Sequence, residues 1–114
     1  MIPENLDECF VELAKVISLE EIEVIRICTE DELSVYHHGL GRWLRNNWGL
    51  WAGSNLRDWF NDKGIHHADD MSAIILTSFW RFLNQKPIDF ESQVKFYQDY
   101  WAKMNKMMAI ILLK

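Results

Sequence analysis

Residues 68–83 read ADDMSAIILTSFWRFL, and this stretch predicts the centre of the fold. Its side chains repeat at helical spacing and form one face of a helix, made of Met71, Ile74, Ile75, Ser78, Phe79 and Phe82. Leu76, Trp80 and Leu83 extend the apolar surface to the other faces. A helix that is apolar nearly all round is usually buried. We therefore expect this helix at the centre, with other helices packed around it.

The segment that follows carries a heptad pattern. Apolar residues are spaced 4, 3, 4, 3, 4 and 3 apart, at Phe90, Val94, Tyr97, Trp101, Met104, Met108 and Ile111. This predicts a helix over residues 89–113 that is roughly 37 Å long, at about 1.5 Å per residue. A globule of this chain length has a radius of gyration of only about 13 Å, so the last turns are expected to overhang.

An overhanging end would expose the apolar sequence MMAIILL, and exposed apolar patches mark partner or self-association sites. We expect residues 1–104 to form a single helical domain, and residues 105–114 to form an apolar extension that continues the last helix. Self-association into a homodimer or larger oligomer would use Met104, Met108 and Ile111. Two alternatives remain open: the tail folds back over the core, or it is disordered.

Helix start signals recur upstream. Asn5 with Glu8, Ser18 with Glu21, and Thr29 with Glu32 each have the spacing of a capping box, in which the first side chain accepts from an early backbone N–H. The third pair predicts a helix that begins near Glu30 and includes Leu33, Leu40 and Leu44. Ser54 and His67 are expected to cap two further helices, and Gly64 should end the first of these in a left-handed conformation.

These patterns predict an all-α protein, a compact irregular bundle of about five to six helices with a long C-terminal helix. No stretch alternates between apolar and polar residues as a strand does. The length of 114 residues suits a single domain, and six Trp, six Phe and three Tyr exclude a disordered chain. Two cysteines cannot form a disulfide scaffold, and we expect buried thiols in a reducing cytoplasm.

Charge is distributed unevenly. Residues 1–35 contain ten acidic and two basic residues, whereas residues 36–114 contain seven acidic and ten basic ones. Such an acidic front repels phosphate backbones, so we expect no nucleic-acid partner. It is typical either of solvated helix faces or of a surface that steers a basic partner. We find no signal peptide and no membrane span in the sequence, and expect a cytoplasmic protein that binds no membrane.

Residues 37–51, HHGLGRWLRNNWGLW, resemble the signature of a bacterial domain family of unknown function, which reads roughly H-x-G-L-G-x-x-I-R-N-x-W-G-L-W. Residues 64–72, GIHHADDMS, are similar to the G-I-x-H-P-D-D-M-S of that family, except that Ala68 replaces the usual Pro. Shorter similarities include Asn84, Lys86, Pro87, Ile88 and residues 97–101, so the resemblance extends from about residue 3 to 103. The tail from about Asn105 lies outside it. The resemblance implies no function.

A polar and aromatic cluster within and near this signature is the strongest candidate binding site. It consists of His37, Arg42, Arg45, Asn46, Asn47, Trp48, Trp51, Asp69 and Asp70. Guanidinium groups bind carboxylates or phosphates bidentately and stack on aromatic rings. The cluster therefore predicts one of three things: a structural network in which Arg45 pairs with Asp69 or Asp70, a face that binds a protein partner, or a pocket for a small anionic ligand.

No catalytic residue can be assigned, because no nucleophile elbow, phosphate-binding loop or dinucleotide motif is present. Adjacent histidines on a helix point about 100° apart, so the pairs at 37–38 and 66–67 do not predict a metal site, and no cofactor is expected. The favoured function is a small protein-interaction module of the immunity protein, antitoxin or inhibitor kind. The alternative is an anionic-ligand-binding protein or enzyme that uses His37, Arg45, Asn46 and Asp70.

Overall fold

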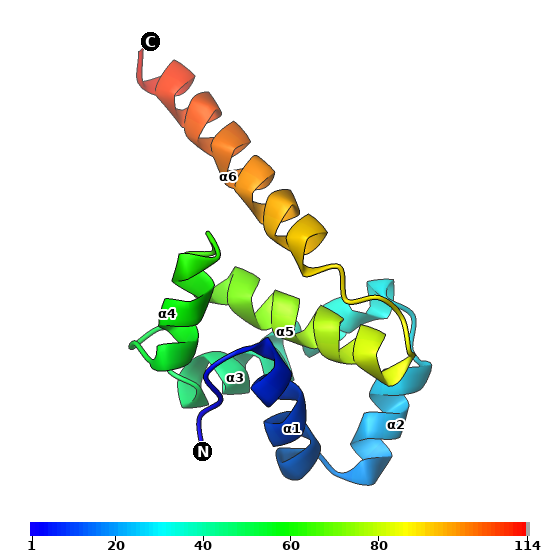
Figure 1. The fold of residues 1–114 in the computed structure, drawn as a ribbon. Coiled ribbons are helices and arrows are strands. Elements are labelled where there is room, and N and C mark those ends of the chain that lie inside the picture. The colour runs from blue at the N-terminus through cyan, green and yellow to red at the C-terminus, as the bar shows by residue number, and fades with distance from the viewer. Residues whose placement is uncertain (114) are drawn as a thin grey trace.

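The computed structural model describes residues 1–113, and within them it shows six α-helices and no strand (Figure 1). This confirms the predicted all-α class and the long C-terminal helix. Two short irregular helices, η1 and η2, stand between α2 and α3. The elements are α1 (Leu6–Val16), α2 (Leu19–Ile27), η1 (Asp31–Tyr36), η2 (His37–Gly41), α3 (Arg42–Asn47), α4 (Asn55–Asp62), α5 (Ala68–Leu83) and α6 (Phe90–Leu112).

Helix α5 lies at the centre, as its composition predicts, with α1, α2, α3 and α4 around it (Figure 1). Met71, Ile74, Ile75 and Phe79 are almost completely buried. Phe82 departs from the expected core face, because 54% of it remains exposed. It lies near the end of α5, where the ring of Phe10 stacks on it at 4.9 Å between centroids.

Four of the predicted N-caps form the expected hydrogen bonds, including Thr29, whose Oγ1 accepts from the Glu32 backbone N–H at 3.3 Å while Glu32 Oε1 accepts from the Thr29 backbone N–H at 2.7 Å. The backbone N–H of Glu8 donates to Asn5 Oδ1 at 2.9 Å, and the side chains of Ser18 and Ser54 accept in the same way at the starts of α2 and α4. His67 also precedes its helix in an extended conformation, but its side chain makes no capping hydrogen bond. Its ring stacks instead on Trp101, with 3.8 Å between the ring centroids.

Residues 31–47 differ from the single regular helix expected near Glu30. They form a 3₁₀ turn, a π turn and an α-helix in succession. Gly41 explains part of this irregularity, since a Cβ there would lie 3.1 Å from Arg45 Nη1 and 3.3 Å from the Tyr36 carbonyl oxygen. The missing side chain lets the backbone of η2 pass close to the Arg45 guanidinium.

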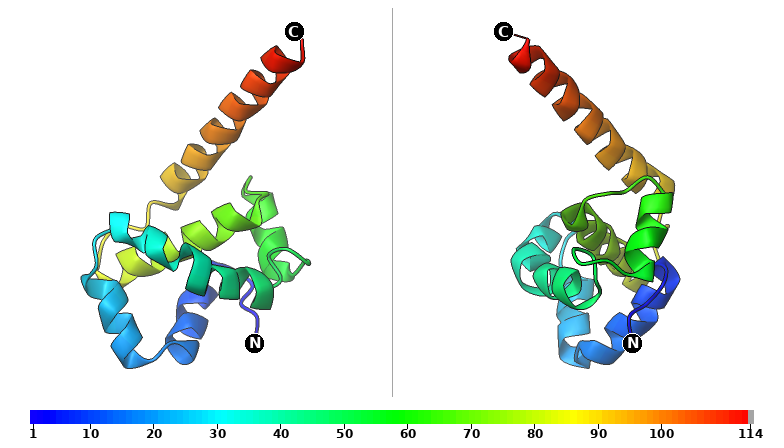
Figure 2. Two further views of the ribbon diagram at one scale, coloured as in Figure 1. Left: turned by 180° about the vertical axis from the view of Figure 1, so that it is seen from behind. Right: turned by 90° about the vertical axis from the view of Figure 1, so that its left-hand side faces the viewer.

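Helix α6 projects away from the body formed by α1–α5, and its outer end and the N-terminus lie at opposite ends of the molecule (Figures 1 and 2). The described chain is accordingly elongated, with extents of 53 × 29 × 24 Å. Three side chains anchor the near half of α6. The Phe90 ring packs 5.2 Å from that of Trp59, Gln93 Nε2 donates to Ser78 Oγ at 3.1 Å, and Trp101 bonds to α5.

The rest of α6 extends beyond the body, as the heptad pattern predicts. Residues 107–113 are exposed, and we call them the apolar tip because all seven are apolar. The helix runs without interruption to Leu112, so the predicted extension continues it, while Lys114 lies outside the described residues. Among residues 1–113, no helix is both long enough and apolar enough to span a membrane.

Candidate functional site

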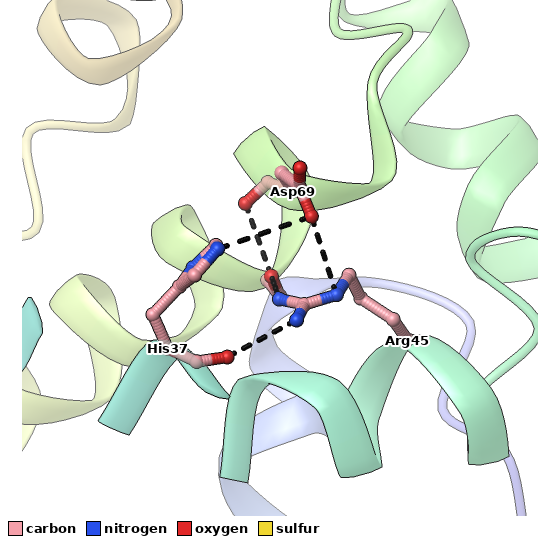
Figure 3. Close-up of polar contacts among 4 residues, drawn as sticks. His37, Arg45 and Asp69 are labelled. Atoms are coloured by element: carbon pink, nitrogen blue, oxygen red, sulfur yellow. Dashed lines mark hydrogen bonds and ion pairs between the residues drawn. The ribbon is translucent and has the colours of Figure 1, made fainter. Parts of the chain in front are cut away.

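Arg45 on α3 is the centre of the polar cluster, and its side chain is only 4% exposed (Figure 3). Its Nη1 donates to Ser72 Oγ at 2.8 Å, and its Nη2 donates to the His37 carbonyl oxygen at 3.1 Å. Its Nε lies 3.3 Å from Asp69 Oδ1 in an ion pair without hydrogen-bond geometry. The guanidinium therefore links η2, α3 and α5.

The rim of this cluster is open to solvent at Asp69 and His37. The side chain of Asp69 is 64% exposed, and His37 Nε2 lies 4.0 Å from its Oδ1. The Trp51 ring covers another side of the guanidinium, with 5.5 Å from Arg45 Cζ to the ring centroid. Protein atoms already surround the guanidinium. We therefore interpret Arg45 as a residue that links η2, α3 and α5, and not as a binding site for an added anion.

The structure brings together only part of the predicted cluster. His37, Arg45, Trp51 and Asp69 converge, whereas Arg42 and Asn46 are exposed and make no side-chain hydrogen bond within the described residues. The Asn47 side chain donates to the Trp43 carbonyl oxygen at 2.9 Å. Trp48 is 3% exposed and packs edge-to-face on Trp43, so it belongs to the core.

Asp70 lies apart from Arg45, although it adjoins Asp69 in sequence. Successive residues on a helix point about 100° apart, so only one of the two carboxylates can face Arg45. Asp70 Oδ2 accepts a 2.8 Å hydrogen bond from Trp101 Nε1 on α6. Of the two pairings that the sequence left open, Arg45 with Asp69 is the one formed.

A cleft of about 350 Å³ lies between α6 and the start of α5. Its lining includes His66, His67, Asp70, Tyr97 and Trp101. Burial raises the pKa of the Asp70 carboxyl, while the Trp101 hydrogen bond and the nearby His67 oppose that rise. Burial also raises the pKa of the Tyr97 phenol. The Asp70 carboxylate in this cleft already accepts the hydrogen bond from Trp101 on α6. We therefore interpret the cleft as the joint that holds α6 on the body.

Sequence reasoning missed this joint. Asp70 and Trp101 are 31 residues apart, and no local spacing relates them. The only signal was the position of Trp101 on the face of α6 that the heptad pattern predicts to be covered. His67 carried a misleading signal, because its position before α5 suggested a capping role.

The two histidine pairs, from which the sequence predicted no metal site, lie on different elements. Within residues 1–113, no three His, Cys, Asp or Glu side chains are placed to hold one metal ion. The His37 and His38 rings pack edge-to-face at 5.1 Å on η2, while His66 and His67 lie at the α6 joint.

The predicted self-association residues lie along the outer half of α6. Met104 is half-buried, whereas Met108 is 50% and Ile111 is 60% exposed. Sequence reasoning missed a second exposed stripe beside them, which we call the flank stripe: Phe96, Tyr100, Met107 and Ile111. Its spacing of 4, 7 and 4 residues is helical and was visible in the sequence.

Comparison with known proteins places the chain in a family. No curated protein and no solved structure matches it. A family model described as a domain of unknown function (DUF6794) matches residues 2–83, which is shorter than the expected resemblance to about residue 103. The match ends at the last residue of α5, so the whole of α6 lies outside it. The chain therefore belongs to the DUF6794 family, whose model covers α1 to α5 of this chain and stops before α6.

Proposed function

We propose that this protein is a small protein-interaction module, of the immunity protein, antitoxin or inhibitor kind, and that α6 is its binding element. The observation that supports this most is the apolar tip. Ile110, Ile111, Leu112 and Leu113 are each more than half exposed, and they project beyond the body (Figure 2).

Exposed apolar surface of this kind is unfavourable in water, at about 25 cal/mol per Å² left uncovered. Monomeric proteins rarely expose contiguous apolar patches, and such patches mark interaction sites. A helix whose apolar side chains are presented to a groove is a recurrent mode of protein recognition. The tip has both properties, since it is helical and its apolar residues stand free of the body.

The charge pattern and the thiols support the remaining features of the proposal. The acidic side chains of α1, α2 and η1 lie on the body and would steer a basic protein surface toward it. Cys9 and Cys28 are free thiols, which suits a reducing compartment such as the cytoplasm.

The alternative, a pocket for small anions or an active site around His37 and Arg45, receives less support from the geometry. Ser72, the His37 carbonyl and Asp69 already surround the Arg45 guanidinium. An incoming anion would have to displace Asp69, which carries the same sign of charge.

Site-specific photo-crosslinking in the native host tests the proposal. A benzophenone side chain placed at Leu112 should form covalent adducts with protein, because the tip is in contact with a partner. The same probe at Leu19 is the matched control, since Leu19 is also apolar and 85% exposed but lies at the start of α2. Adducts would be identified by mass spectrometry, and the activity of a captured enzyme would be measured with and without this protein. Equal labelling at both positions, or none at Leu112, would contradict the proposal.

A further inference from the structure

We propose that the partner of α6 is α6 of a second copy of this chain, paired antiparallel along the flank stripe. This inference rests on the proposed function, because it names the partner of the same helix. It predicts a symmetric dimer in which each apolar tip lies beside the body of the other copy.

The flank stripe is complementary to the same stripe on a second copy that runs in the opposite direction. At 100° per residue, Phe96, Tyr100, Met107 and Ile111 fall within an arc of about 60° on the helix surface. When two copies run antiparallel, Phe96 faces Ile111 of the second copy, and Tyr100 faces Met107 of the second copy. Each large aromatic ring then meets an aliphatic side chain. A two-fold interface requires self-complementarity of this kind.

The apolar tip alone would be too short for a stable interface. It covers about 10 Å of helix, whereas standard interfaces bury roughly 800 Å² on each partner. The flank stripe covers about 23 Å and includes two aromatic side chains, Phe96 and Tyr100, which are 65% and 48% exposed. Pairing along the whole stripe therefore buries much more surface than contact between tips.

A groove beside the stripe offers a second wall for the incoming tip. It has a volume of about 520 Å³ and lies between η1, α5 and α6, with Leu33, Leu76, Phe96 and Tyr97 among its lining residues. In the antiparallel pairing, Ile111 of the second copy reaches Phe96 and hence this groove. Because two walls then contact the tip, apolar residues next to the stripe such as Ile110 are also covered, while the opposite face around Ala109 stays exposed.

Charge favours the same arrangement. Glu30 and Asp31 lie on the groove, and Glu30 is paired with Arg81, whereas the outer half of α6 carries Lys103 and Lys106. In the antiparallel pairing Lys106 of the second copy faces position 101, about five residues from Phe96, so it brings a basic side chain toward this acidic rim. The two copies of Lys103 approach each other at the two-fold axis, where both ammonium groups stay in contact with solvent because Lys103 is exposed.

Sedimentation velocity over a range of protein concentrations tests the dimer. The full chain should shift from 13.6 kDa to twice that mass within the micromolar range. Met107→Asp places a carboxylate in the stripe and should weaken the dimer at least about a hundredfold. Ala109→Asp adds the same charge at nearly the same position along α6 but on the opposite side of the helix. It should leave the dimer unchanged.

Cysteine crosslinking tests the antiparallel orientation in a Cys28→Ser background. Tyr100→Cys and Met107→Cys chains should form disulfides when mixed, and neither should form one with itself. Self-crosslinking of either variant, or a dimer that survives Met107→Asp, would overturn the inference. If the chain stays monomeric while Leu112 captures a different protein in the host, the proposed function stands and the inference fails. If Leu112 captures nothing, the proposed function fails as well.

Discussion

The indole nitrogen of Trp101 donates a 2.8 Å hydrogen bond to Asp70 Oδ2, and this bond ties the middle of α6 to the first turn of α5. It is the last side-chain hydrogen bond between α6 and the body among the described residues. Beyond it, Met104 is still half-buried, and the helix is then exposed for about two turns up to Leu112. The bond therefore marks the boundary between the part of α6 that the body covers and the part left for a partner.

Replacing Asp70 should alter the pH dependence of stability. Burial raises the pKa of the folded-state Asp70 carboxyl above its unfolded value, so the folded chain binds the proton more tightly. The stability from this group is present below about pH 4 and is lost as the pH rises through the raised folded value. Asp70→Asn removes this pH-dependent loss of stability, because the amide does not ionise, and its carbonyl oxygen still accepts the hydrogen bond from Trp101. Its melting temperature should fall less than that of the wild type between pH 4 and pH 7, as measured by circular dichroism.

Asp70→Ala is the control for this experiment, because it removes both the charge and the hydrogen-bond acceptor. Its melting temperature should lie below that of Asp70→Asn at both pH values, since the partly buried indole N–H is left unpaired, at a cost of about 1 kcal/mol. Identical pH profiles for the wild type and Asp70→Asn would show that Asp70 is not desolvated at the joint.

Arg45→Ala should destabilise the body. The substitution leaves Ser72 and the His37 carbonyl without their donor and removes a buried guanidinium that links three elements. A buried polar group left without its hydrogen-bond partner costs about 1–3 kcal/mol, and the Asp69 carboxylate adds little because it is mostly exposed. Urea denaturation measures this loss, and Arg42→Ala is the matched control, because Arg42 is exposed on the same helix. An unchanged midpoint for Arg45→Ala would instead assign Arg45 to ligand binding.

Gly64→Ala should loosen the α6 joint. Gly64 adopts φ +92°, a left-handed conformation that costs a non-glycine residue about 1–3 kcal/mol. An added Cβ would also overlap the Gln98 side-chain amide on α6. Combining it with Gln98→Ala should restore only the part of the stability that the overlap removed. Full recovery in thermal melts of the double variant would show that backbone strain contributes nothing there.

The Cys9 thiol should stay unreactive in the folded protein. It is completely buried, and burial, with a contribution from Glu8, raises its pKa strongly, so little thiolate forms at neutral pH. Titration with a chromogenic disulfide reagent should label the half-buried Cys28 first and Cys9 only after unfolding. A Cys28→Ser chain isolates the Cys9 signal, and rapid labelling of that variant under native conditions would contradict the packing of α1.

Several features could be predicted from the sequence because they depend on near neighbours. The capping pairs at Asn5 and Ser18 act across three residues, and the glycine at position 64 ends α4 through its own backbone freedom. The apolar composition of residues 68–83 was enough to place α5 at the centre. The regular helix expected from Glu30 was wrong, since the approach of Arg45 to the backbone of η2 shapes that segment.

The sequence by itself determined where the helices lie outside residues 31–47, that one helix is central, and that the last helix is longer than the body is wide, because periodicity and capping are local properties. Only the tertiary structure decided that Asp69 pairs with Arg45 and that Asp70 holds Trp101. It also decided which half of the α6 seam the body covers and that Phe96 and Tyr100 stay exposed. These outcomes depend on which residues far apart in the chain meet in space, and no local pattern encodes that.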